Sequence, residues 1–405
     1  MIDIEKTRPR TELCPVCGHN IAFSLFDGGE QPLATLAWPT SEREALSQAR
    51  YPLDFVQCPD CSHIWNCRFQ YDAIPYRDHP NRMFNAGTAW NGHIVETANL
   101  LLSELPESPV VVDIGCGEGQ FLSYLQHAQP NGSYHGFDPN IGKRQSSSIN
   151  FSARLFEPIS DIPKLEPDAI VIRHVLEHLT HPSAFLEEIL WGCMDLQKTC
   201  VLFAEVPCID RVLKFNRLAD FYYEHMSNFT TESFTRILSR LGDPRKILHG
   251  YGEEVAYGLV AIAPEEKSKN RVAEASKFRL AALDSISRVG RQLELLAKAD
   301  KSIVIWGGTG KAAAFMHYYG LDIERFPLVV DSDVDKVGTH VPGMGQKIRH
   351  RDTLLEQDIH TIIIPMQWRA RDVFAEIQEL GIGFGQVLIE HAGELVDYVN
   401  GDHPY

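Results

Sequence analysis

The sequence predicts an α/β protein in which a doubly wound parallel-sheet core follows a small metal-stapled module and precedes a second, smaller unit of the same strand, turn and helix type. Three observations support this fold class. Two Cys-x-x-Cys pairs, Cys14–Cys17 and Cys58–Cys61, lie near the N-terminus. A glycine-rich turn follows an apolar strand at 110–119, and a similar strand, turn and acid recur at 301–333. We therefore expect a four-cysteine module over 1–75, a core over 76–264, a connecting helix over 265–299 and a C-terminal unit over 300–405.

The composition limits the class of protein. With 405 residues, 44% of them hydrophobic, the chain is too long for one compact core. Its net charge of −16 argues against a nucleic-acid partner, because neutralising phosphates needs a basic face. No apolar signal segment opens the chain, and no run approaches the ~18 uncharged apolar residues of a membrane span. We expect a cytoplasmic protein without a membrane partner, whose nine cysteines are reduced or bound to metal.

The N-terminal module has too little apolar sequence to fold without a staple. Residues 1–75 are short apolar pieces broken by proline and glycine, apart from one expected helix over Ser41–Ala49 that Thr40 could cap. The two cysteine pairs, 40 residues apart, supply the four thiolates of a closed tetrahedral zinc site. Because all four ligands come from the protein, we expect the metal to be structural.

Three alternatives to this zinc site remain open. One pair could be a redox dithiol, although the flanking sequence lacks the βαβ context of a thioredoxin motif. Iron in the same sulfur cage would make an electron carrier. Cys67, His63 and His19 lie close enough in the sequence to be rival ligands.

The core is predicted from strands that alternate with helices. The apolar positions from Trp90 to Leu102 fit a helix. Buried parallel strands are expected at Val110–Asp113, Tyr134–Asp138, Ala169–Arg173 and Thr199–Val206. After the core, apolar residues recur every three or four positions and predict the connecting helix, at Ala282, Ile286, Val289, Leu293 and Leu296.

The glycine turn predicts a cofactor site. Glycines at 115, 117 and 119 let the backbone approach a ligand, and Asp138 ends the next strand, 25 residues after Asp113, where a carboxylate can hold a ribose. NAD competes for this geometry, but the turn reads Asp-x-Gly-x-Gly-x-Gly in place of Gly-x-Gly-x-x-Gly.

Together with the segment 168–179, this turn resembles the class I S-adenosylmethionine-dependent methyltransferases over roughly residues 85–250. The resemblance implies that Asp113, Gly115 and Gly117 face the methionine part of S-adenosylmethionine and that Asp138 holds its ribose. It also implies that the adenine lies near Phe156 and Glu157.

A polar aromatic cluster, Tyr222-Tyr223-Glu224-His225, lies at the predicted start of a helix. Methylation of carbon requires removal of a proton, and histidine is the side chain best suited to this near neutral pH. A purely structural role for the cluster also stays open, because tyrosine and histidine are often half-buried.

The four-cysteine module, the core, the Tyr-x-Glu-His segment and the C-terminal unit together resemble the nucleotide-sugar C-methyltransferases, which methylate a ring carbon of TDP-linked 4-keto-deoxysugars. The resemblance implies a small-molecule acceptor and an enolate mechanism, and it leaves the oligomeric state open. It implies that His225 is the base, with Glu224 and Tyr222 beside it, and that Tyr76 and His178 also lie in the active site.

Two departures from this family concern the acceptor. The segment after Tyr76 lacks the usual serines, and Arg173-His174-Val-Leu-Glu177-His178 replaces a segment that usually begins with asparagine and lacks an acid. Arg77, Arg82 and Arg173 could serve an anionic acceptor, although arginine on a surface loop is the commoner explanation. The alternative function is an N- or O-methyltransferase on a different small metabolite. A non-catalytic binding protein is a third hypothesis, against which the intact Asp113, glycines and Asp138 argue.

The C-terminal unit contains a second glycine turn, Gly308-Thr-Gly310-Lys-Ala-Ala313, followed by Asp331. The pattern is of the dinucleotide type and is not a Walker loop, because Ala312 follows the lysine where a metal-binding Ser or Thr is needed. The resemblance implies a degenerate Rossmann-like domain that helps to enclose the nucleotide. A scaffold without ligand contact is the alternative.

Overall fold

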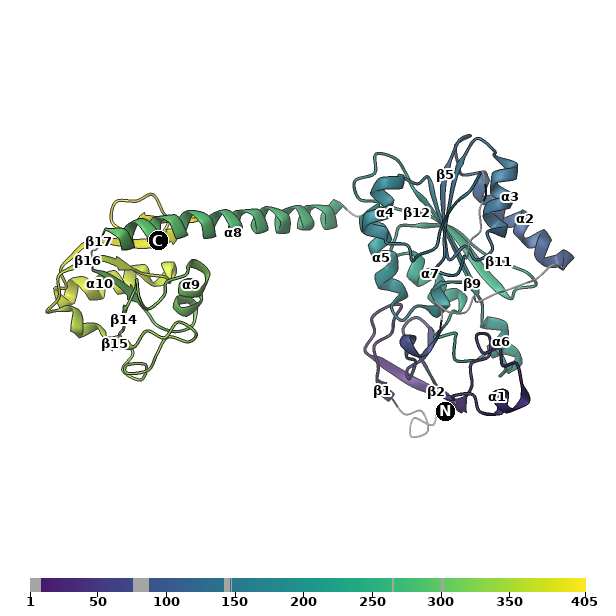
Figure 1. The fold of residues 1–405 in the computed structure, drawn as a ribbon, viewed down its shortest axis with the longest axis horizontal. Coiled ribbons are helices and arrows are strands. Elements are labelled where there is room, and N and C mark those ends of the chain that lie inside the picture. The colour runs from purple at the N-terminus through teal and green to yellow at the C-terminus, as the bar shows by residue number, and fades with distance from the viewer. Residues whose placement is uncertain (1–8, 76–86, 142–145, 147, 264–265, 300–301) are drawn as a thin grey trace. The chain divides into compact units, whose positions relative to one another are not determined.

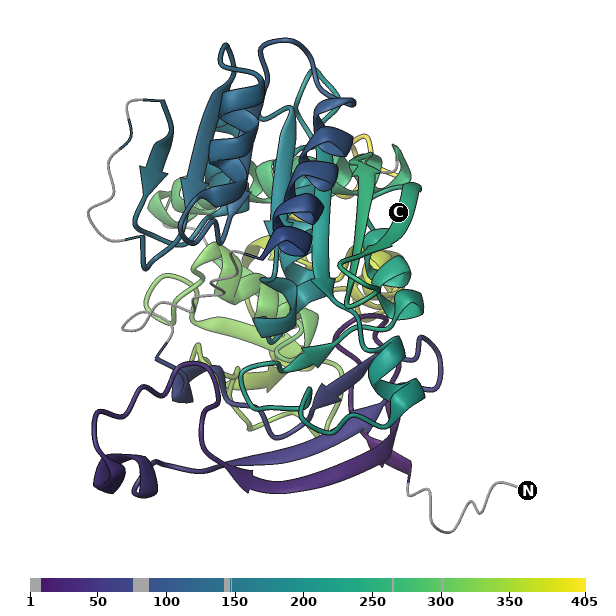
Figure 2. The ribbon, with the colours of Figure 1, turned by 90° about the vertical axis from the view of Figure 1, so that its right-hand side faces the viewer.

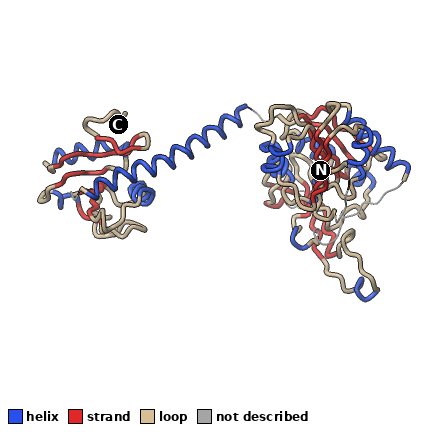
Figure 3. The backbone as a smooth tube through the Cα atoms, turned by 45° about the horizontal axis from the view of Figure 1, so that its top comes forward, coloured by secondary structure: helices blue, strands red, loops and turns tan. Residues whose placement is uncertain are grey.

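The computed structural model describes residues 9–75, 87–141, 146, 148–263, 266–299 and 302–405. The chain folds into two compact units, unit 1 over Met1–Glu266 and unit 2 over Lys267–Tyr405 (Figure 1). Each unit is an α/β structure, and Figure 3 shows its strands lying among its helices. Within the described residues, the longest helix is rich in charge, and no helix there is apolar enough to cross a membrane.

The N-terminal part of unit 1 is an antiparallel sheet with strand order β1-β2-β3-β4-β10. The last of these strands comes from the far end of the core sequence, so the module and the core share one sheet (Figure 2). Two short helices accompany the sheet, α1 (Glu42–Leu46) and the 3-10 helix η1 (Tyr71–Ala73). The strands are β1 (Pro9–Thr11), β2 (Ile21–Gln31), β3 (Tyr51–Gln57), β4 (Ile64–Asn66) and β10 (Ser227–Asn228).

Helix α1 is shorter than predicted, and its cap is Ser41 in place of Thr40. The Ser41 side chain accepts the Glu44 backbone N–H at 3.2 Å. The Glu44 carboxylate accepts the Thr40 backbone N–H at 2.8 Å and the Thr40 hydroxyl at 3.0 Å, so it holds the residue before the cap. The helix therefore begins one residue later than the sequence pattern suggested.

The core of unit 1 is a seven-stranded sheet of order β11-β12-β9-β8-β5-β6-β7. Strands β5 to β9 are parallel, and β12 joins β9 antiparallel. The four predicted strands and the first core helix are confirmed, whereas the β11–β12 hairpin was not predicted. The strands are β5 (Val110–Ile114), β6 (Ser133–Phe137), β7 (Asn150–Ser152), β8 (Ala169–Arg173), β9 (Val201–Pro207), β11 (Pro244–Gly250) and β12 (Val255–Ala261).

Helices cover both faces of this sheet (Figure 1). One apolar cluster packs α2 and α3 on the sheet, and a second packs α4, α5 and α7 on the other face. The chain leaves β5 in one direction to β6 and returns in the other to β8, so the carboxyl ends of β5 and β8 form the crevice where such folds bind ligands. The helices are α2 (Thr88–Leu102), α3 (Gln120–Ala128), α4 (Pro158–Leu165), the 3-10 helix η2 (Leu176–His178), α5 (Pro182–Gly192), α6 (Asp210–Phe215) and α7 (Thr231–Leu238).

Unit 2 is a smaller sheet of order β15-β14-β13-β16-β17-β18, parallel except for β18. The predicted helix is α8 (Glu266–Lys298), and its residues Val289 and Leu293 belong to the core of this unit. The other elements are β13 (Ile303–Trp306), α9 (Lys311–Tyr319), β14 (Leu328–Asp331), β15 (Ile348–His350), η3 (Arg351–Leu354), β16 (Ile359–Ile363), η4 (Gln367–Arg369), α10 (Ala370–Leu380), β17 (Phe384–His391) and β18 (Glu394–Asp397).

Candidate active site and metal centre

The four predicted cysteines converge in the N-terminal module. Their sulfur atoms all lie within 4.8 Å of one another. The Cys14 and Cys61 sulfurs are 3.6 Å apart, and those of Cys17 and Cys58 are 3.5 Å apart. Four sulfurs at ~2.3 Å from a tetrahedral ion would be separated by about 3.8 Å. The arrangement therefore fits one tetrahedral metal ion.

The two knuckles are built in the same way. In each, the first cysteine donates its backbone N–H to a residue five positions on, Cys14 to His19 at 2.8 Å and Cys58 to His63 at 2.8 Å. A residue with positive φ closes each turn, Gly18 at 79° and Ser62 at 57°. Two similar turns thus present their sulfurs to one point.

The rival ligands lie outside the cluster in the described part of the chain. The Cys67 thiol donates to the Asp54 carbonyl at 3.3 Å. His63 is fully buried, contacts the Ser227 hydroxyl at 3.2 Å and packs against Phe229. His63 therefore joins the module to β10, beside the Tyr-x-Glu-His segment.

The glycine turn between β5 and α3 provides a cradle. Gly115, Gly117 and Gly119 have φ of 70°, 50° and 72°. A Cβ on Gly115 would come within 2.4 Å of Val175, and one on Gly119 within 2.7 Å of Phe151. Next to Gly117 nothing lies within 4 Å of such a Cβ. Two glycines are thus required by packing, and the third faces open space where a ligand can approach.

Two carboxylates flank this turn. Asp138 accepts the Gly117 N–H at 3.0 Å and the Asn140 N–H at 2.7 Å, which holds it beside the open space. Burial raises the pKa of Asp113 to about 7, against the opposing charge of Arg173 and with a further increase from Asp138. These residues fit a ligand that carries both a positive charge and a ribose, as S-adenosylmethionine does.

The predicted adenine neighbour Phe156 is used in the core. Its side chain is 6% exposed and meets the Phe137 ring edge-on, with 4.9 Å between ring centroids. Its packing therefore supports the wall behind the turn, and its contact with adenine stays a prediction.

Three predicted catalytic residues meet at one place. The Tyr222 hydroxyl lies 2.6 Å from His225 Nε2. The His178 ring, from η2, meets the His225 ring edge-on at 5.0 Å between centroids. His178 Nδ1–H donates to the Glu224 carbonyl at 2.7 Å, which fixes the ring relative to the segment. Tyr76 lies outside the described residues, as do Arg77 and Arg82.

The environment keeps this pair neutral. Burial lowers the pKa of His225 to about 3, His178 lowers it further, and Glu177 opposes both. Burial also raises the pKa of Tyr222 above its ordinary value. At neutral pH the His225 imidazole is therefore in the form that can accept a proton, next to a phenol that can donate one.

The segment around Glu224 differs from the prediction. It does not start a helix but turns and enters β10. Glu224 is fully buried, and its Oε1 accepts the backbone N–H groups of Thr35 at 2.7 Å and Leu36 at 3.1 Å. The predicted helix start is therefore wrong, and Glu224 anchors a loop of the N-terminal module beside the cluster.

A buried charge network next to the cluster was missed by the sequence analysis. Glu205 in β9 is fully buried and is contacted by Arg173 Nη2 at 2.7 Å, His174 Nε2 at 3.0 Å and His93 Nε2 at 2.6 Å. The available signal was a single acid, Glu205, within an otherwise apolar buried strand. His174 has φ of 54°, a conformation that costs about 1–3 kcal/mol outside glycine and often marks functional sites.

This network corrects the interpretation of Arg173 as a binding group for an anionic acceptor. The guanidinium is paired with Glu205 and lies over the Phe121 ring at 4.6 Å. Its side chain is only 10% exposed. Arg173 is therefore part of the interior of the protein.

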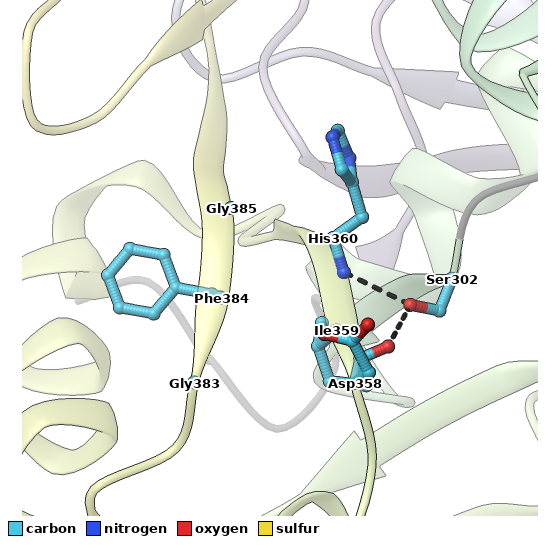
Figure 4. A pocket seen from close by; sticks show the side chains of 7 residues that line it. All are labelled: Ser302, Asp358, Ile359, His360, Gly383, Phe384 and Gly385. Carbon is cyan, nitrogen blue, oxygen red and sulfur yellow. Dashed lines mark hydrogen bonds between the residues drawn. The ribbon is translucent and has the colours of Figure 1, made fainter.

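Unit 2 contains an open cavity of about 650 Å³ (Figure 4). The Ser302 hydroxyl there accepts the His360 backbone N–H at 3.0 Å and donates to the Asp358 carbonyl. Ser302 therefore links the segments that lead into β13 and β16, at the amino-terminal ends of these strands. The second glycine turn follows the carboxyl end of β13. The cavity is lined by Ser302, Asp358, Ile359, His360, Gly383, Phe384 and Gly385.

Comparison with known proteins agrees with this architecture. The family described as "Methyltransferase domain" matches residues 92–242, and the family described as "C-methyltransferase C-terminal domain" matches residues 253–389. The C-methyltransferase NovU of Streptomyces niveus is 25% identical over 369 residues, which cover 83% of this chain and 84% of NovU.

Two solved structures are among the similar ones. The plantazolicin methyltransferase BpumL, solved with a desmethylPZN analog and SAH, is 16% identical, with a TM-score of 0.34 over 44% of this chain and 85% of its own. A SAM-dependent methyltransferase from Aquifex aeolicus is 18% identical, with a TM-score of 0.33 over 41% of this chain and 89% of its own. The two family matches, over residues 92–242 and 253–389, lead to one conclusion. The chain is an S-adenosylmethionine-dependent methyltransferase, and its C-terminal region matches the C-terminal domain of C-methyltransferases.

Proposed function

We propose that the protein methylates a ring carbon of a nucleotide-linked 4-keto-deoxysugar of the TDP type. The observation that carries the proposal is the part-buried contact of 2.6 Å between the Tyr222 hydroxyl and His225 Nε2, next to His178. It combines a neutral base with hydroxyl and imidazole donors, which is what a ketone needs in order to lose an adjacent proton and hold the resulting oxyanion.

The proposed chemistry begins at His225. If the Tyr222 oxygen accepts the Nε2–H of His225, then Nδ1 carries the lone pair that removes the proton next to the ketone. The C–H electron pair remains on the acceptor as an enolate, whose carbon attacks the methyl group. S-adenosylmethionine, when bound, would supply that methyl group from its positively charged sulfur, which would keep the electron pair of the broken S–CH₃ bond and leave as S-adenosylhomocysteine.

The developing oxyanion needs hydrogen-bond donors. Tyr222 and His178 are candidates within the described cluster, and Tyr76 is a third from the sequence resemblance. Each donor of this kind contributes on the order of 3 kcal/mol to the transition state. Because these side chains are half-buried, their interactions are less screened by water than those at the open surface.

We propose that Cys14, Cys17, Cys58 and Cys61 hold a structural Zn²⁺. The sulfur separations of 3.5 and 3.6 Å support a closed four-sulfur site. Such a site leaves no coordination position for an acceptor. Its role is then to fix the sheet that also contains β10.

The second glycine turn remains a candidate for enclosing the nucleotide. It connects β13 to α9, with Gly307 and Gly310 at φ of 107° and 60°. The Gly308 N–H points to Asp331 at 3.4 Å. The strand, turn and helix are those predicted, and contact with the nucleotide is a proposal.

The acceptor is tested with labelled S-adenosylmethionine and a panel of TDP-sugars with and without a ketone, followed by mass spectrometry. We expect the label on a carbon of keto-sugars alone. Methylation that occurs only on non-sugar acceptors would contradict the proposal and favour N- or O-methyl transfer.

Cofactor binding gives a further prediction. Asp138→Ala removes the proposed ribose acceptor and the bond to Gly117, and we expect S-adenosylmethionine affinity to fall by about 2 kcal/mol, or ~30-fold. Isothermal titration calorimetry measures the change. Asp195→Ala, at an exposed position, is the control and should keep the wild-type affinity. Equal affinities for the two variants would remove Asp138 from the site.

A further inference from the structure

A buried row of alternating charges leads from β9 to the reacting cluster. His174 lies between two carboxylates, with Nε2 at 3.0 Å from Glu205 Oε1 and Nδ1 at 3.5 Å from Glu177 Oε1. The contact with Glu205 is a hydrogen bond, whereas Glu177 lies at ion-pair distance from the other ring nitrogen. A ring protonated on both nitrogens places its positive charge beside both carboxylates. The geometry therefore selects the imidazolium form of His174 between two carboxylates.

Glu177 is the next residue in this row, and no hydrogen bond within the described residues explains why its carboxylate is buried. Its side chain is 1% exposed, and among the described residues neither carboxylate oxygen has a hydrogen-bond partner. Its carboxylate lies within 4.8 Å of ring nitrogens of both His178 and His225. A buried carboxylate with so few bonds is costly and calls for an explanation.

We propose that Glu177 is a positioning residue whose negative charge stabilises the His225 imidazolium formed when His225 removes the acceptor proton, while His174 and Glu205 keep Glu177 ionised. The inference rests on the proposed function, because it requires His225 to be the base. Glu177 itself stays unprotonated. The proton moves from the acceptor carbon to a ring nitrogen of His225, and the C–H electron pair remains on the enolate.

The need for such a charge follows from the surroundings of His225. The ring is half-buried and has a second imidazole, His178, against it, and both features oppose a positive charge. Glu177 is the acid that opposes them. A buried carboxylate plays this part beside the base histidine of serine hydrolases, where it also stays ionised.

The electrostatics of the row support this role. Burial would raise the pKa of Glu177, but contact with His174 and the electrostatic attraction of the neighbouring imidazoles leave it below its ordinary value. Burial likewise disfavours a charged His174, yet its two carboxylate partners raise its pKa to about 9. The groups that face Glu177 are His174, His178 and His225, with Tyr222 next to the last.

The test uses the variant Glu177→Gln, which removes the charge and keeps the volume. TDP-4-keto-6-deoxyglucose is incubated in D₂O without S-adenosylmethionine, and deuterium uptake next to the ketone is followed by NMR. We expect uptake to slow by about 100-fold, with the KM for S-adenosylmethionine unchanged. Glu188→Gln, at an exposed position on α5, is the matched control and should exchange at the wild-type rate.

The pH profile separates this role from mere loss of packing. Without the carboxylate the imidazolium is less stable, so the acidic limb of the exchange rate should move to lower pH by about one unit or more. Glu177→Asp keeps the charge, and we expect it to retain the wild-type acidic limb and most of the rate. If Glu177→Gln slows exchange with no movement of that limb, or exchanges like the wild type, the inference is wrong.

Failure of the inference is distinct from failure of the proposed function. If the wild-type protein produces no exchange in the keto-sugar, or if His225→Asn retains exchange, the base mechanism itself is wrong. If His225→Asn abolishes exchange but Glu177→Gln does not affect it, only the role of Glu177 is wrong.

Discussion

Replacing His225 with asparagine is expected to slow deuterium exchange next to the acceptor ketone by between about 100-fold and 10,000-fold, the usual contribution of a general base. Asparagine keeps a polar side chain near Tyr222 but has no basic nitrogen. Methyl transfer should fall by a similar factor, because the enolate must form first. NMR of TDP-4-keto-6-deoxyglucose in D₂O measures the exchange without any contribution from the cofactor.

The control for this variant is His127→Asn, which makes the same change at an exposed position on α3. It should exchange and methylate at wild-type rates. The affinity for S-adenosylmethionine should be unchanged in both variants, because His225 is not among the residues proposed to bind the cofactor. Should His225→Asn methylate a hydroxyl or an amine at an undiminished rate, the reaction is not carbon methylation by this base.

Loss of one zinc ligand should have the second large effect. We expect Cys58→Ser to lose its bound metal, to destabilise the N-terminal module by several kcal/mol and to reduce methyl transfer as well. Activity should fall because the N-terminal module contacts the segment that carries His225. His63 contacts Ser227, the Asn66 backbone N–H donates to the Met226 carbonyl at 2.9 Å, and Glu224 accepts the Thr35 backbone N–H. Disorder of the module therefore reaches the segment that carries His225.

Metal content by inductively coupled plasma mass spectrometry and hydrogen exchange over residues 9–75 measure these effects. Cys67→Ser is the matched control, since its sulfur lies outside the cluster and donates to Asp54, a bond that serine can also make. The wild type and Cys67→Ser should each contain one zinc per chain. If Cys58→Ser also binds one zinc per chain, the proposed four-sulfur site is wrong. If the wild type contains iron in place of zinc, the site is an iron site.

Much of the fold follows from local sequence patterns. Strands with an uncharged interior, such as Ala169–Arg173 with Arg173 only at its end, are buried on both faces, and the glycines at 115, 117 and 119 are needed where φ is positive. Both features are visible without the structure. The two cysteine pairs likewise identify a site because each pair is closed by its own turn. These features depend on residues a few positions apart.

Other features depended on contacts between distant segments. The cap of α1 moved by one residue because Glu44 bonds back to Thr40, and the expected helix at Glu224 became β10 because Ser227 pairs with Trp65. Neither pairing is visible in the periodicity of the segment itself. Tertiary contacts override local propensity at such places.

The sequence by itself determined the type of enzyme, because the glycine turn, the acid 25 residues later and the cysteine pairs are short-range signals of chemistry. Only the tertiary structure decided how the charged residues are used. In the structure Arg173 pairs with Glu205, and the buried Glu224 carboxylate accepts the Thr35 backbone N–H. The Glu177 carboxylate lies within 4.8 Å of a ring nitrogen of His225. The physical reason is that a charge can be buried only beside its partners, and here those partners lie on different strands and loops, whose meeting is fixed by topology and packing.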